Sequence, residues 1–214
     1  ARAAAPLMAL EAYFLDMNSC APASKQVSAT IMDKHNLRYV DVAVMEPVYP
    51  KQLNVPLLIS GDWSDEVSTI LTNLSLTFRI IDGKVGRASS IKMVRSIMVK
   101  GLEALTAECA LAAHAADVVD EVFQSLRNGH PKIDVEQRAT YNFERSMTHG
   151  VRRATEMAEV AKMVADLGLP NHLARGSAHW QRIIADSTMD RADSKHGRDL
   201  QSFIDELLQR IRGD

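Results

Sequence analysis

The pattern of the sequence changes near residue 86, and this change limits what the chain can fold into. Before it, short apolar runs alternate with helix-like stretches. Strands that alternate with helices are typical of an α/β layer around a largely parallel sheet. After it, no strand pattern remains, and apolar residues recur at the three- and four-residue spacing of helices. The sequence therefore predicts an α/β region over residues 1–85 and an all-helical region over residues 86–214.

The α/β region has clear boundaries, because turn-forming residues separate its apolar runs. We expect strands over Ala12–Leu15, Leu37–Val44, Pro56–Ser60 and Leu76–Ile81. We expect helices over Pro22–His35, where proline suits the first turn, and over Ser64–Asn73, with Ser64 as the N-cap.

The helical region opens with an apolar stripe that starts at Ile91 and ends before Gly129-His130-Pro131. It predicts either one very long helix or two nearly collinear helices. Further helices are expected over Val135–Leu167, Leu173–Ile184 and Asp199–Arg212, the last one amphipathic, with a polar loop over Asp186–Gly197.

Composition excludes several classes of protein. The net charge of -2 gives no general attraction to nucleic acid or to an anionic membrane. No apolar run is long enough to span a bilayer. Cys20 and Cys109 lie far apart and match no metal or redox spacing, so free thiols in a reducing cytoplasm are expected, and no metal site.

Lys92 stands in an informative phrase. The small-residue turn Gly86-Arg87-Ala88-Ser89-Ser90 opens the long helix, and the lysine follows about two turns into it, close to the predicted junction. A lysine placed there can meet a ligand held between two domains. The alternative is a solvated lysine on the surface of the helix.

Three phrases together resemble the β-hydroxyacid dehydrogenase superfamily, which includes 6-phosphogluconate dehydrogenase and 3-hydroxyisobutyrate dehydrogenase. Asp16-Met17-Asn18-Ser19-Cys20-Ala21-Pro22 is similar to Asp-x-Ser-Thr-x-x-Pro, the strand end beside the nicotinamide. Tyr39-Val40-Asp41-Val42-Ala43-Val44 is similar to the strand that reads Asp-x-Pro-Val. The phrase around Lys92 is similar to Gly-x-Gly-x-x-x-Lys-x-x-Asn-Asn, whose lysine is catalytic in that family.

This resemblance implies a fold and an activity. The fold is the C-terminal half of a Rossmann-type dinucleotide-binding domain, followed by an all-helical domain built on a long helix. The activity is an NAD- or NADP-dependent oxidation or reduction of a small hydroxy or oxo acid, with Lys92 as general acid/base. Asn18 and Ser19 would line the nicotinamide, and the helical domain would form a homodimer.

The sequence departs from the family pattern because it lacks the glycine-rich turn that binds the pyrophosphate. No Gly-x-Gly-x-x-Gly occurs in the 214 residues, so the first βαβ unit, which holds the pyrophosphate, is absent. We therefore expect that the chain begins in the middle of a larger protein and does not bind NAD(P) tightly by itself.

The substrate-binding phrases also differ. The backbone cradle Ser-Gly-Gly is replaced by Met45-Glu46-Pro47, in which proline lacks an N–H and glutamate repels a carboxylate. The asparagine pair after the lysine is replaced by Arg95-Ser96, and Ser96 is the remaining candidate to hydrogen-bond the substrate. These differences are typical of a less-characterised branch with its own C-terminal helical domain.

A second cluster contains His149, Arg152, Arg153 and Glu156, whose spacing places them along one side of a helix. Arg152 and Arg153 could bind the acid group of the substrate. The alternative is a ladder of Arg–Glu ion pairs that joins helices.

Two classes of function thus remain open: an NAD(P)-dependent oxidoreductase and a helical dimerisation module without catalysis. A Gly-x-Gly-x-x-Gly segment upstream of Ala1 would favour the first. The substrate, the choice between NAD and NADP, and a following decarboxylation are not fixed by these residues.

Overall fold

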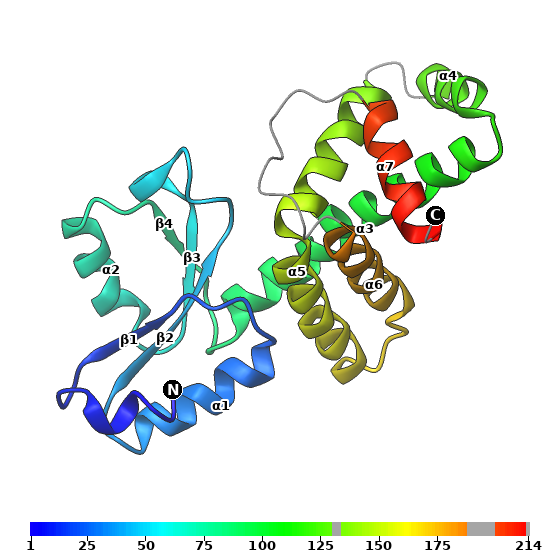
Figure 1. The fold of residues 1–214 in the computed structure, drawn as a ribbon. Helices are drawn as coiled ribbons and strands as arrows, with labels where there is room; N and C mark the ends of the chain where they lie inside the picture. Colours follow the sequence, from blue (N-terminus) through cyan, green and yellow to red (C-terminus); the bar gives the residue numbers. More distant parts are fainter. Residues whose placement is uncertain (130–133, 188–199, 213–214) are drawn as a thin grey trace. The chain divides into compact units, whose positions relative to one another are not determined.

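The computed structural model describes residues 1–129, 134–187 and 200–212, and Figure 1 shows its elements along the chain. The chain divides into two compact units. One contains Ala1–Ser96 with Lys162–Leu169, and the other contains Ile97–Ala161 with Pro170–Asp214. The predicted α/β region followed by a helical region is confirmed, and helix α3 (Arg87–Ala115) begins directly after residue 86 and contributes to both units.

The first unit contains the sheet. Its elements are the 3-10 turn η1 (Ala5–Leu7), β1 (Tyr13–Asp16), α1 (Pro22–Asp33), β2 (Arg38–Val44), the 3-10 turn η2 (Gln52–Asn54), β3 (Leu57–Ser60), α2 (Ser64–Asn73) and β4 (Phe78–Ile80). The strands lie in the order β1-β2-β3-β4. Each expected strand and helix is present, with ends that differ by a few residues at most.

The direction of the strands differs from the expectation of a largely parallel sheet. β1 and β2 are parallel, as are β3 and β4, but β2 and β3 are antiparallel, with Val42 opposite Ile59. The parallel pairs are joined through α1 and α2, whereas only η2 lies between β2 and β3. Parallel neighbours need a crossover, usually a helix, so this short connection returns the chain in the opposite direction.

Helices cover both faces of this sheet, which places the residues of each strand in two separate cores. Val40, Val42 and Ile59 pack with Val67 and Leu71 of α2 on one face. The alternate residues of the same strands face the other way. Tyr39 packs with Met32 of α1, and Ala43 packs with Ala88 at the start of α3. Asp41 lies between Tyr39 and Ala43 on β2, so its side chain points to the α1 and α3 side.

One predicted cap is wrong. Ser64 is the first residue of α2 rather than its N-cap, which is Trp63. The Ser64 hydroxyl donates to the carbonyl oxygen of Gly61 at 2.8 Å, so it closes the preceding turn and leaves the helical N–H groups without a side-chain cap.

The second unit is helical. After α3 come α4 (Val119–Gly129), α5 (Val135–Asp166), α6 (His172–Asp186) and α7 (Leu200–Arg212). The sequence left open one very long helix or two, and the structure has two, because Asp117 adopts a left-handed φ of 57° between α3 and α4. The core of this unit includes Phe143 of α5, Ile184 of α6 and Leu207 of α7. The loop expected after residue 186 and the expected helix start at residue 199 fall mostly outside the described residues.

The face that α3 buries is not the one that its large apolar residues define. Its buried positions in the second unit are mainly alanine and charged residues, among them Ala104, Ala107 and Ala110. Met98 and Leu105 of the apolar stripe are 65% and 59% exposed. Within the described residues, no helix is both long and apolar enough to cross a membrane.

Candidate active site

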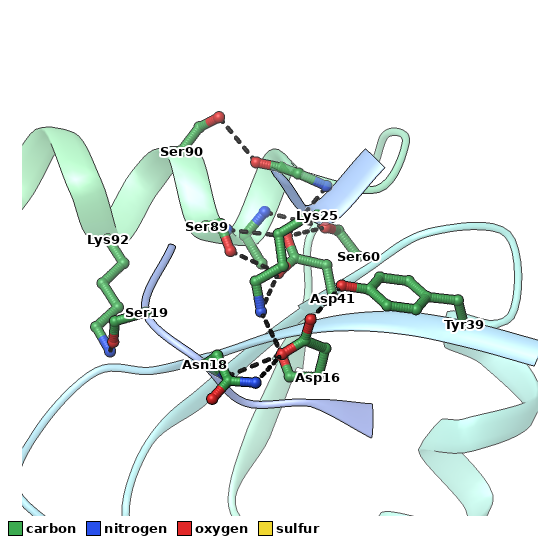
Figure 2. Close-up of polar contacts among 12 residues, drawn as sticks. Asp16, Asn18, Ser19, Lys25, Tyr39, Asp41, Ser60, Ser89, Ser90 and Lys92 are labelled. Carbon is green, nitrogen blue, oxygen red and sulfur yellow. Dashed lines mark hydrogen bonds and ion pairs between the residues drawn. The ribbon is translucent and has the colours of Figure 1, made fainter. Parts of the chain in front are cut away.

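Lys92 and Ser19 meet in the first unit, as Figure 2 shows. The Lys92 ammonium donates a hydrogen bond to Ser19 Oγ at 2.5 Å. Lys92 lies in the second turn of α3, and Ser19 lies in the loop that joins β1 to α1. Both side chains are half-buried, so a ligand can reach them and water is only partly excluded.

Asp16, the last residue of β1, fixes the loop that carries Ser19. Its Oδ1 accepts hydrogen bonds from the Asn18 backbone N–H at 3.0 Å and from the Asn18 side-chain amide at 2.8 Å. Its Oδ2 accepts one from the Tyr39 hydroxyl at 2.6 Å. Burial alone would raise the pKa of Asp16, but the bond from Tyr39, the charge of Lys25 and the bonds from Asn18 together lower it below its ordinary value. Burial and the Asp16 carboxylate raise the pKa of Tyr39, which therefore stays a neutral donor.

Asp41 holds the first turn of α3. Its Oδ2 accepts from the backbone N–H groups of Gly86 at 3.1 Å and Ser89 at 3.0 Å, and its Oδ1 accepts from the Ser89 hydroxyl at 2.6 Å. A carboxylate at this end satisfies N–H groups that have no partner within the helix, and it also suits the helix dipole. Gly86 has a φ of 100° and lies against Pro22, with room for no larger side chain without a shift. The sequence motif Gly86–Lys92 is thus anchored at its first residues.

The positions where the sequence departs from the family pattern are also occupied by defined contacts. Glu46 forms an ion pair with Lys51 at 2.6 Å, and the Arg95 guanidinium donates to the Met45 carbonyl oxygen at 3.2 Å. Ser96 is buried on α3, one turn after Lys92. Arg95 therefore ties α3 to the segment after β2.

Arg152 and Arg153 lie in the second unit and contact different glutamates. The exposed Arg152 pairs with Glu156 one turn along α5, whereas the buried Arg153 pairs with Glu103 of α3. Glu156 also pairs with Lys100 at 2.9 Å. These contacts favour the alternative of an Arg–Glu ladder, although a substrate role for either arginine stays a prediction.

Gln181 and Lys100 also belong to this ladder, and neither was singled out from the sequence. Gln181 of α6 donates to Glu103 at 2.8 Å, and burial lowers the pKa of Lys100 despite the opposing charge of Glu156. His149, on the same helix as the arginines, has a lowered pKa because of burial and then because of the charges of Arg145, Arg152 and Arg153.

In the first unit, sequence reasoning missed that Lys25 and Asp41 are partners in a buried ion pair. Lys25 has no exposed surface. Its position was readable in one respect: Lys25, Ala29 and Met32 follow the spacing of the inward face of α1. A lysine on that face predicts a buried counter-charge, but the sequence does not say which carboxylate supplies it.

A nicotinamide cofactor is implied by the resemblance, and the donor set can be compared with it. Asn18 and Ser19 follow the carboxyl end of β1, where open α/β sheets bind ligands. Their amide and hydroxyl groups suit the carboxamide end of such a cofactor. No glycine-rich turn for a pyrophosphate is found among the 214 residues. The described residues contain no cluster suited to a metal ion.

Comparison with known proteins agrees with this arrangement. Residues 113–184 match a family described as a domain of unknown function, DUF1932. An uncharacterised 28.5 kDa protein of Methanothermus fervidus is 26% identical over 157 residues, which cover 72% of this chain and 59% of that protein. The chain thus spans less than two thirds of the length of this relative.

Two solved structures are similar over most of the chain. A conserved hypothetical protein from Sinorhizobium meliloti is 30% identical, with a TM-score of 0.81 over 98% of this chain and 72% of that one. The conserved protein MTH1747, described as structurally similar to 3-hydroxyacid dehydrogenases, is 26% identical, with a TM-score of 0.66 over 86% of this chain and 71% of that one.

Proposed function

This chain belongs to the β-hydroxyacid dehydrogenase superfamily, and we propose that it supplies the acid–base machinery of an NAD(P)-dependent oxidoreductase that acts on a small hydroxy or oxo acid. The observation that carries the proposal is the hydrogen bond between Lys92 and Ser19. It brings a lysine of the helix α3 to the loop at the carboxyl end of β1, the edge where such folds bind their ligands.

Lys92 is the general acid/base of the proposed mechanism. As an ammonium it donates a proton to the carbonyl oxygen during reduction, and as an amine it accepts the hydroxyl proton during oxidation. A nicotinamide cofactor, when bound beside Asn18 and Ser19, would supply the hydride chemistry. Ser19 accepts a hydrogen bond from Lys92 and so orients the ammonium, while Asn18 and Ser19 line the nicotinamide side.

The acid group of the substrate needs a cationic partner. We keep Arg152 and Arg153 as the proposed anion-binding residues and Ser96 as the group that hydrogen-bonds the substrate. Arg152 is the more accessible of the two arginines, because its side chain is 62% exposed and that of Arg153 is 5% exposed. A guanidinium can bind a carboxylate or a phosphate through two parallel hydrogen bonds.

Substitution of Lys92 tests the mechanism. In the full-length gene product, assayed with a panel of small hydroxy acids and both cofactors, Lys92→Met should lower turnover by about two to four orders of magnitude. The dissociation constant of NAD(P)H, measured by fluorescence, should change little. The exposed Lys84, close to the start of α3, gives a matched control, and Lys84→Met should keep full turnover. Near-normal turnover in Lys92→Met would remove this residue from the mechanism.

We also propose a homodimer formed through the helical domain. Its support is the apolar stripe on α3, in which Met98, Leu102 and Leu105 are exposed. Contiguous exposed apolar surface marks an interaction site, and two copies related by a two-fold axis can cover the same stripe on each other.

Light scattering tests the assembly. The protein should be dimeric at micromolar concentration, and Met98→Glu with Leu102→Glu should make it monomeric, because burial of two carboxylates in an apolar interface is costly. Leu173→Glu, at an exposed leucine of α6, is the control and should stay dimeric. A wild-type monomer would contradict the proposal.

A further inference from the structure

Lys25 of α1 is fully buried, and its ammonium contacts two carboxylates. Its Nζ donates to the backbone carbonyl oxygen of Asp16 at 2.6 Å, and it lies 3.2 Å from Asp16 Oδ1 and 3.5 Å from Asp41 Oδ1. Figure 2 shows this ammonium between the two acids. A charge without water needs such partners, because burial of an unpaired ammonium is very unfavourable.

The two carboxylates hold two different parts of the candidate site. Asp16 binds both donors of Asn18 and thereby fixes the loop that presents Ser19. Asp41 accepts the N–H groups of Gly86 and Ser89 and thereby fixes the helical turn that precedes Lys92. The loop and the helix are far apart in sequence, but each is hydrogen-bonded to an aspartate, and both aspartates contact the same ammonium.

The charge balance shows why a cation is needed between them. Asp16 is the last residue of β1, and in the register of the two parallel strands it lies opposite Asp41, in the middle of β2. Both are buried, and like charges directly opposite each other repel. The Lys25 ammonium offsets this repulsion, so both carboxylates can keep accepting hydrogen bonds from the loop and from α3.

We propose that Lys25 is a positioning residue: its buried ammonium joins Asp16 to Asp41, and so holds Ser19 and Lys92 within hydrogen-bond distance of each other. The catalytic meaning of this link rests on the proposed role of Lys92, whereas the link itself does not. This proposal assigns a role to a side chain that touches neither substrate nor cofactor. It also explains why a lysine lies on the buried face of α1.

Competitive acylation measures the link without a substrate. The full-length gene product is treated with trace acetic anhydride between pH 7 and 10, and the acetylated peptide that contains Lys92 is quantified by mass spectrometry against the one that contains the exposed Lys34. Ser19→Ala removes the acceptor and sets the upper limit of the response. We expect the relative rate of Lys92 to rise about two- to tenfold in Ser19→Ala, which corresponds to one net hydrogen bond.

Lys25→Met should raise the rate at Lys92 to a similar extent and leave the other lysines unchanged. Since loss of the ammonium leaves two buried carboxylates together, this variant can fail to fold. Lys25→Met with Asp41→Asn restores the charge balance but not the link, so it should fold and still show the raised rate. Circular dichroism and a thermal melt establish the folded state of each variant.

An unchanged rate at Lys92 in either folded Lys25 variant would overturn the proposal, as would an equal rise at all lysines, which indicates general loosening. The proposed function fails separately. If Lys92→Met keeps its turnover, the acid/base role is lost while a selective rise in acylation still establishes Lys25 as the link. If both roles hold, Lys25→Met with Asp41→Asn should lower kcat and leave the NAD(P)H dissociation constant unchanged.

Discussion

Gly150 of α5 lies against Gln181 and Ala185 of α6, and its replacement gives a sharp test of the packing in the helical unit. A Cβ at this position would lie 2.5 Å from the Gln181 carbonyl oxygen and 2.8 Å from Ala185 Cβ. The carbonyl belongs to the backbone of α6 and cannot rotate away. Because 3.4 Å is the start of ordinary contact, α6 would have to move by about 1 Å in Gly150→Ala.

The cost follows from two opposing terms. Overpacking of a close contact destabilises by about 1–3 kcal/mol. Alanine recovers up to about 1 kcal/mol through its better helix propensity. We therefore expect a net loss of about 1–2 kcal/mol, which for a chain of this size lowers Tm by roughly 2–8 °C. The shift of α6 also disturbs the Gln181–Glu103 hydrogen bond, so the loss should lie at the upper end of this range.

Gly176 is the matched control. It lies in α6, and apart from its chain neighbours and the backbone of its own helix, no atom of the described residues lies within 4 Å of the position of its Cβ. Gly176→Ala should therefore raise stability by up to about 1 kcal/mol through propensity alone. Urea unfolding followed by circular dichroism compares the two variants. Equal or higher stability of Gly150→Ala relative to wild type would refute the close approach of α5 and α6.

The remaining predictions concern the charged residues of the helical unit. Arg153→Ala leaves Glu103 buried without its cation and should destabilise by about 3–5 kcal/mol, whereas Arg152→Ala should leave Tm near that of wild type and raise KM only if Arg152 binds the substrate. A thermal melt beside steady-state kinetics separates these effects, and an unstable Arg152→Ala would count against them. The pKa of His149 is lowered in the fold, so the unfolded state binds its proton first and stability is lost as the pH falls through the ordinary histidine value of about 6.5. His149→Gln should flatten the pH dependence of Tm between about pH 5 and 7, and an unchanged slope would show that His149 does not contribute to it.

The elements of this fold could be predicted from local signals, but the direction of the strands could not. Pro22 marks the start of α1, because its ring restricts the backbone angles. The apolar run of β3 ends before Gly61, because glycine allows the wider range of backbone angles that turns need. The antiparallel pairing of β2 with β3 depends on the path of the connecting segment. The connecting segment has no apolar periodicity, so no pattern of residues predicted the direction of β3.

The candidate site shows the same division. The motif around Lys92 and the strand-end phrase with Ser19 were readable, because each has a defined spacing relative to a turn. The contact between them was not, since it depends on how α3 begins on Asp41. The buried charges were missed for another reason. Lysine is almost always exposed, and only the position of Lys25 on the inward face of α1 argues against that expectation.

Helix α3 explains why periodicity predicts a helix more securely than the face that it buries. Residues recur at helical spacing on both of its faces. One face has large apolar side chains such as Met98 and Leu105, and the other has small or charged side chains such as Lys100 and Glu103. The second face is the buried one, because its alanines allow close approach and its charges pair with α5. In the part of the chain that the structure describes, a core built this way leaves Met98 and Leu105 of α3 exposed. The same choice of buried face that stabilises the unit therefore also provides the surface through which we expect two copies to associate.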